Sequence, residues 1–135
     1  MDNGRLKTES NRTIAKNFWE LTVWQKSHKW VLDTYTVTKT FPKEEIFGLT
    51  SQLRRAAISI PANIAEGFKR RSNVDKAKFY NIAQSSVEES RYYLILAKDL
   101  KFGECQQLLI DLDAISKMLE KYYKYVRTDT YGFKN

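Results

Sequence analysis

Residues 49–68 read LTSQLRRAAISIPANIAEGF and carry the clearest structural signal in this 135-residue chain. Apolar or small residues recur in this segment three or four positions apart, which is the spacing of one face of an α-helix. These positions are Leu49, Leu53, Ala56, Ile60, Asn63 or Ile64, and Gly67. Thr50 is expected to cap the start of the helix. The small side chains of Ala56, Ala57 and Ala62 predict close contact with a neighbouring helix.

Pro61 interrupts the helical pattern of this segment. Proline lacks a backbone donor and crowds the carbonyl four residues earlier, which here belongs to Ala57. The apolar spacing continues past it to Phe68, so we expect a kink near residues 57–61 rather than the end of the helix. The polar residues Asn63 and Glu66 have two interpretations. They form either a local cap for the kink with a Glu66–arginine ion pair, or a hydrogen-bonded layer between subunits.

Three further segments show helical spacing. The segment 23–40 carries bulky or apolar residues at Trp24, His28, Val31, Tyr35 and Thr38. Phe41-Pro42 ends this helix, because the residue before a proline avoids the α region. After residue 68, a helix capped by Ser72 or Asn73 carries Phe79, Ala83, Ser86, Ser90, Tyr93, Ala97 and Leu100. Beyond a turn at residues 101–103, a fourth helix carries a regular seam of Cys105, Leu108, Leu112, Ile115, Leu119, Tyr122 and Val126.

Four helices with short connections predict an all-α fold, an antiparallel up-down-up-down four-helix bundle. The chain has only 5 glycines and 2 prolines, too few turn formers for a many-stranded β fold. We expect a polar N-terminal arm at residues 1–17, the bundle at 18–127 and a polar tail at 128–135. The small-residue faces at 56–57 and 83–90, with more apolar surface than one bundle needs, predict a homo-oligomer.

Positive charge concentrates in one part of the chain. The formal net charge is +7, and the seven basic residues of segment 49–80 are Arg54, Arg55, Lys69, Arg70, Arg71, Lys76 and Lys78. Such a cluster is typical of a surface that binds a polyanion, most often nucleic acid. The alternative is a solvated face that only keeps the protein in solution. Tyr80, Tyr92 and Tyr93 lie near it, as base-stacking surfaces or as packing residues.

The sequence gives little support for an enzyme. One Cys and one His exclude a disulfide framework and disfavour a metal site. We expect His28 to be a core or interface histidine and Cys105 to be a packed thiol. No nucleotide-binding, zinc-protease or hydrolase motif occurs. No apolar run is long enough to span a membrane, and residues 1–10 lack a secretory signal. The expectation is a cytoplasmic protein without catalytic activity, metal or cofactor.

The block 48–68 resembles a bacterial four-helix-bundle family, named for proteins encoded in intervening sequences of 23S ribosomal RNA genes. The segments VWQK at 23–26 and FPKEE at 41–45 also fit this family. The resemblance extends from about Phe18 to Tyr125. Looser matches in the third helix are Phe79, Ala83, Ser86, Glu88 or Glu89, Leu94, Ala97 and Leu100.

The resemblance implies an antiparallel four-helix bundle that assembles into a homopentamer without established catalytic activity. It also implies similarity to the accessory proteins of diversity-generating retroelements, which bind nucleic acid and a reverse transcriptase. We therefore expect an oligomer that binds RNA or DNA through phosphate contacts, with little sequence readout. The alternative is a protein-interaction scaffold whose partner is a protein such as a reverse transcriptase.

Overall fold

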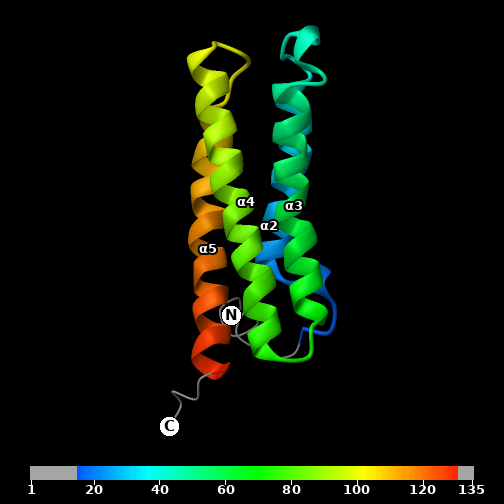
Figure 1. Ribbon diagram of the computed structural model, residues 1–135, viewed down its shortest axis with the longest axis vertical. Helices are drawn as coiled ribbons and strands as arrows, with labels where there is room; N and C mark the ends of the chain where they lie inside the picture. Colours follow the sequence, from blue (N-terminus) through cyan, green and yellow to red (C-terminus); the bar gives the residue numbers. More distant parts are fainter. Residues whose placement is uncertain (1–14, 131–135) are drawn as a thin grey trace, which may run out of the picture.

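The computed structural model describes residues 15–130, which contain four α-helices, two short 3-10 helices and no strand (Figure 1). The elements are η1 (Phe18–Glu20), α2 (Thr22–Thr38), η2 (Lys43–Glu45), α3 (Leu49–Lys69), α4 (Asn73–Asp99) and α5 (Gln106–Thr130). The all-α prediction is therefore confirmed. Most of the expected N-terminal arm and the last five residues of the expected tail lie outside the described residues, and α5 continues to Thr130, past the expected bundle boundary at 127.

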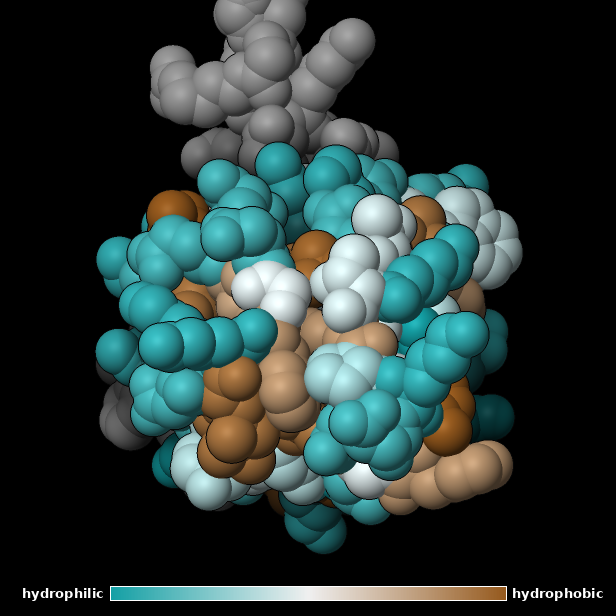
Figure 2. Space-filling model, turned by 90° about the horizontal axis from the view of Figure 1, so that it is seen from above, coloured by the Kyte–Doolittle hydropathy of each residue, from teal (hydrophilic) through white to brown (hydrophobic). Residues whose placement is uncertain are grey.

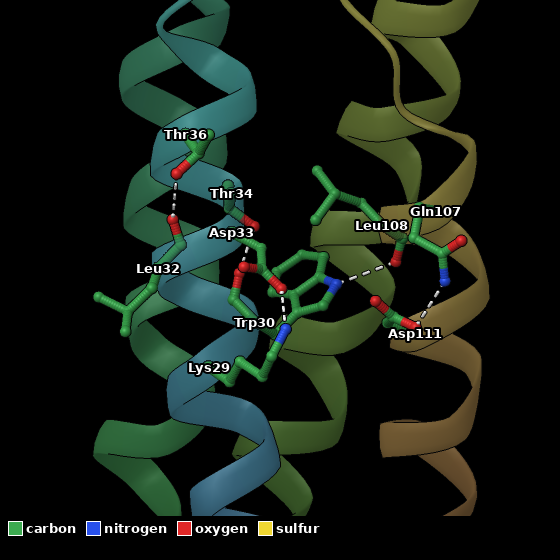
Figure 3. Close-up of polar contacts among 9 residues, drawn as sticks. All are labelled: Lys29, Trp30, Leu32, Asp33, Thr34, Thr36, Gln107, Leu108 and Asp111. Carbon is green, nitrogen blue, oxygen red and sulfur yellow. Dashed lines mark hydrogen bonds and ion pairs between the residues drawn. The ribbon is translucent and has the colours of Figure 1, made fainter.

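The four long helices lie side by side, and α3 packs against α2 and α4 while α5 packs against α4 and α2. One polar contact marks each of three neighbouring pairs. The Trp30 Nε1–H donates to the Leu108 carbonyl across α2 and α5 at 2.9 Å (Figure 3). The Arg54 Nε–H donates to Thr38 Oγ1 across α3 and α2 at 2.9 Å. Gln84 of α4 donates to Glu120 of α5.

The small residues of α3 and α4 bring these two helices together. Ala56, Ala83 and Ser90 are fully buried. Ser86 Oγ donates to Ser59 Oγ at 2.7 Å. A Cβ added at Gly67 would meet the Tyr80 ring at 2.7 Å, so only glycine fits there. The close helix contact predicted from Ala56 and Ala57 is confirmed, but it forms within one chain, and Ala62, which was predicted to take part, is exposed. These faces therefore give no support to the expected homo-oligomer.

The predicted core face of α2 is partly wrong. The structure buries Val23, Ser27, Trp30, Val31, Thr34 and Thr38. His28 is exposed and stacks on the ring of Trp24 at 4.9 Å. The buried face includes polar residues that the prediction did not place there. Ser27 is one of them, and its Oγ donates to the Val23 carbonyl at 2.7 Å. A serine or threonine whose hydroxyl donates to a backbone carbonyl of its own helix has no unpaired donor and can occupy a core position.

Two other helical predictions have mixed outcomes. The α5 seam from Cys105 to Val126 is confirmed, with Tyr122 packed at its edge. In the stripe predicted for the third helix, however, Leu100 lies just past the end of α4 and is exposed, whereas Tyr80 joins the core. The prediction that Thr50 caps the start of α3 is wrong. The Glu45 carboxylate has that position, where it accepts the Leu49 N–H at 2.9 Å. Ser72 caps α4 as predicted, accepting the Asp75 N–H at 3.1 Å.

Helix α3 runs through Pro61 without a break, and Pro61 is buried. Two residues later, the Asn63 amide donates to the Ser59 carbonyl at 2.8 Å and to Ser59 Oγ at 2.9 Å, one turn back along α3. Asn63 is thus bonded within its own helix. Glu66 is exposed, and among residues 15–130 it makes no ion pair, so the expected Glu66–arginine pair is not formed there.

Replacing Pro61 with alanine is expected to leave the fold intact and to change the free energy of unfolding by less than about 1 kcal/mol. Alanine restores a donor for the Ala57 carbonyl, while the lost rigidity of proline in the unfolded chain offsets that gain. Urea unfolding followed by circular dichroism measures the change. A loss above about 3 kcal/mol would show instead that the packing requires the proline geometry.

Candidate nucleic-acid interface

The seven basic residues predicted to bind nucleic acid fall into two groups at opposite ends of α3. Arg54 and Arg55 lie in its second turn, whereas the other five lie at its end and at the start of α4. At a rise of 1.5 Å per residue, Arg55 and Lys69 are about 21 Å apart along the helix axis. The seven residues therefore do not form one compact patch.

Arg54 and Arg55 are both bonded to other protein groups. The Arg54 guanidinium lies 4.4 Å from the centre of the Tyr35 ring, in addition to its bond to Thr38. Arg55 forms an ion pair with Glu89, and this hydrogen bond raises the pKa of the guanidinium. Glu89 also accepts the Tyr93 hydroxyl at 2.9 Å. These contacts give the two arginines a structural role between helices.

Lys69, Arg70 and Arg71 are exposed where the chain leaves α3. Lys69 is the last residue of α3, and the backbone of Arg70 is extended, with φ −66° and ψ 149°, so the side chains of Arg70 and Arg71 no longer follow helical directions. The Arg70 guanidinium rests 4.4 Å from the centre of the Phe79 ring, which supports it from one side. The geometry of the junction thus presents three adjacent cations to solvent.

Lys76 and Lys78 differ in their availability. Lys76 donates to the Phe68 carbonyl at 2.6 Å, and partial burial lowers the pKa of its amine. It therefore caps the C-terminal end of α3. Lys78 is exposed and lies 3.7 Å from Asp75 Oδ1, a weak surface pair.

Helix α5 contributes cations that the sequence analysis missed. The rings of Tyr80 and Tyr122 are 6.0 Å apart, which places the last turns of α5 beside the first turns of α4. Lys121 and Lys124 are exposed in this part of α5, and Lys124 lies 3.7 Å from Glu120 Oε2. We call the exposed cations of this region the basic end: Lys69, Arg70, Arg71, Lys78, Lys121 and Lys124.

The opposite end of the molecule carries an apolar depression. Its lining residues are Tyr35, Ile46, Phe47, Thr50, Ser51, Arg54, Arg55 and Ile58. Phe47 is 93% exposed, and the hydroxyl of buried Thr50 has no partner among the described residues. Figure 2 views the molecule from this end and shows apolar side chains between hydrophilic ones.

Residues 19–121, which include α2, α3, α4 and most of α5, match the family model described as 23S rRNA-intervening sequence protein. The chain belongs to this family. No curated protein matches it. The match ends at Lys121, so the basic end of this 23S rRNA-intervening sequence protein lies almost wholly within the family region, and only Lys124 lies beyond it.

The tyrosines proposed for stacking have different environments in this 23S rRNA-intervening sequence protein. Tyr80 is 3% exposed, and burial raises the pKa of its hydroxyl. A stacking role for Tyr80 is therefore wrong. Tyr93 is half-buried and bonded to Glu89. Tyr92 is 58% exposed on α4, well away from the basic end.

The remaining reactive groups of this family member have structural surroundings. Cys105 is buried, its Sγ lies 3.5 Å from the Phe102 carbonyl, and burial raises the pKa of the thiol. The expected packing role of Cys105 is consistent with this environment, whereas His28 lies outside the core. Between residues 15 and 130, no three His, Cys, Asp or Glu side chains are grouped to hold a metal ion. No helix in the same range is both long and apolar enough to cross a membrane.

Proposed function

We propose that this protein is a non-enzymatic nucleic-acid-binding protein that contacts the phosphates of RNA or DNA through the basic end. The observation that carries the proposal is the exposed run Lys69–Arg71 at the same end of the bundle as the exposed Lys121. None of these four side chains forms an ion pair within the described part of the chain. Acidic groups are nevertheless close by, since Asp75 and Glu120 approach Lys78 and Lys124.

Phosphate binding by these cations follows from their chemistry. A guanidinium donates two parallel hydrogen bonds to one phosphate, and a lysine ammonium attracts it as a point charge. Each contact releases a condensed counterion, so affinity falls as salt rises. Phosphate contacts carry no sequence information. Binding therefore has little dependence on base sequence.

Fluorescence anisotropy with labelled RNA and DNA oligonucleotides over a salt series tests this function. The expected result is binding at low salt to several unrelated sequences, with a steep loss between about 50 and 200 mM salt. An absence of binding at low salt to every oligonucleotide would contradict the proposal.

We further propose that the protein follows the up-down-up-down helix order and assembles into a homopentamer, the number that the family resemblance implies. Support comes from large apolar side chains left exposed along α4. Val74, Ile82, Tyr92 and Ile95 are 44–58% exposed. A ring of five chains would repeat the basic end five times, and such repetition raises affinity for a long polyanion without new contacts.

Light scattering coupled to gel filtration is expected to give a mass near five times 15.9 kDa at micromolar concentration. The physical reason is burial of the exposed apolar side chains of α4 between chains. Replacing both Ile82 and Ile95 with serine is expected to lower the assembled fraction. A wild-type mass of a single chain under the same conditions would show that the protein does not self-associate.

The second candidate function is a protein-interaction scaffold whose partner is a protein such as a reverse transcriptase. The apolar depression beside Phe47 favours it, because an almost fully exposed phenylalanine is typical of a contact surface. Salt distinguishes the two functions. Docking of an apolar partner persists in high salt, whereas phosphate binding does not.

A further inference from the structure

The three tryptophans of the chain have different environments. Trp30 is 1% exposed and Trp24 is half-buried, whereas Trp19 is 53% exposed. Tryptophan carries a large apolar ring, and such rings are mostly well covered in a single folded chain. The exposure of Trp19 therefore requires an explanation.

Trp19 is exposed although its backbone is firmly placed. It lies in η1, where the Gln25 side-chain amide donates to the Trp19 carbonyl at 2.8 Å. The Phe18 ring meets the Trp19 ring edge to face, with centroids 5.1 Å apart and planes at 84°. Phe18 in turn packs on Trp24, also at 5.1 Å. A row of contacts thus holds the Trp19 ring on the surface of the bundle.

The contacts of η1 place Trp19 toward the basic end. Arg54 bonds to Thr38, so the last turn of α2 lies beside the early turns of α3. The start of α2 and the preceding η1, which packs on both α2 and α3, consequently lie toward the last turns of α3. Figure 1 shows the blue segment before α2 near the α3–α4 connection. Lys69, Arg70 and Arg71 occupy that connection.

The carboxylate nearest in sequence to Trp19 is already engaged. Glu20 accepts the Lys16 backbone N–H at 3.0 Å and the Asn17 amide at 3.4 Å. Its oxygens therefore have local hydrogen-bond donors, and both donors are neutral groups. Trp19 thus offers an exposed aromatic ring at the end of the bundle that carries Lys69, Arg70 and Arg71. Proteins that bind single-stranded nucleic acid combine such rings with cations.

We propose that Trp19 is a base-stacking residue and that the protein consequently prefers single-stranded RNA or DNA to duplex. This inference rests on the proposed nucleic-acid function. Phosphates are present in both forms, so the cations alone do not select between them. Bases in a duplex interior are already stacked, whereas an unpaired base offers its face to an indole ring.

The test compares Trp19→Ala with the wild type on two labelled probes, a 12-nucleotide oligo(dT) and a hairpin duplex with a similar number of phosphates. Loss of one stacked base is expected to weaken oligo(dT) binding about tenfold and to leave duplex binding within about twofold. The salt slope should stay the same, because no phosphate contact is removed. An oligo(U) probe of equal length is expected to give the same loss.

Phe47→Ala is the matched control, since Phe47 is an aromatic side chain that is 93% exposed at the end of the molecule opposite the basic end. It should change neither probe. Trp19→Phe, which keeps an aromatic ring, should retain most of the oligo(dT) affinity and checks for a general loss of structure.

Two results would overturn the inference while leaving the proposed function in place. One is equal weakening of both probes by Trp19→Ala, and the other is unchanged oligo(dT) binding. A wild type that binds neither probe at low salt would overturn the proposed function together with the stacking role.

Discussion

Trp30→Ala is expected to lower the free energy of unfolding by about 4 kcal/mol, the cost typical of removing a large buried aromatic side chain. The Trp30 ring is 1% exposed, and it joins α2 to α5 through the 2.9 Å hydrogen bond to the Leu108 carbonyl (Figure 3). Alanine removes the ring contacts and this bond together. Because domains of this size have roughly 5–15 kcal/mol of stability in total, the loss removes a large fraction of it.

Two further variants separate the ring from the hydrogen bond. Trp30→Phe keeps an aromatic ring but removes the donor, so a smaller loss of about 1–2 kcal/mol is expected. Leu32→Ala is the matched control on the same helix, since Leu32 is 55% exposed, and it should change stability by less than about 0.5 kcal/mol. Urea unfolding measures all three. A loss below about 1 kcal/mol for Trp30→Ala would contradict a core role for this ring.

The predictability of each helix depended on the chemistry of its buried positions. In α5 the buried residues are nearly all apolar, so their spacing identified the seam from Leu108 to Leu119 correctly. In α2 the buried set includes Ser27, Thr34 and Thr38, whose hydroxyls donate to carbonyls four residues earlier. The predicted stripe included Thr38, but a pattern built mainly on apolar residues missed Ser27 and Thr34 and assigned His28 to the core instead.

The candidate site was only partly predictable for a different reason. The cluster was identified from its density along the sequence, but the helical rise of α3 places Arg55 and Lys69 about 21 Å apart along the helix axis. Lys121 and Lys124 are distant in sequence, and the order of the helices brings them to the α3–α4 end. An antiparallel bundle, which the sequence predicted, already implies that the end of α5 meets the start of α4. Applying this topology to the charges would have revealed the two lysines.

Replacing Lys69, Arg70 and Arg71 with serine is expected to weaken nucleic-acid binding more than any other change of equal charge. Loss of three phosphate contacts should reduce the slope of log K against log salt by about 2–3. Affinity should fall about equally for unrelated sequences, because phosphates carry no sequence information. The helical signal should not change, since all three side chains are exposed. Anisotropy over a salt series measures both quantities.

The matched control removes the same charge from the other end of the molecule. Lys39, Lys43 and Lys98 are exposed at the ends of α2 and α4 and at the start of η2. Replacing these three with serine lowers the net charge equally but leaves the basic end complete. If binding depends on local phosphate contacts, this control keeps the wild-type salt slope. If binding depends only on total charge, both variants weaken it alike. Equal salt slopes for the two variants would contradict the prediction and place the binding surface outside residues 69–71.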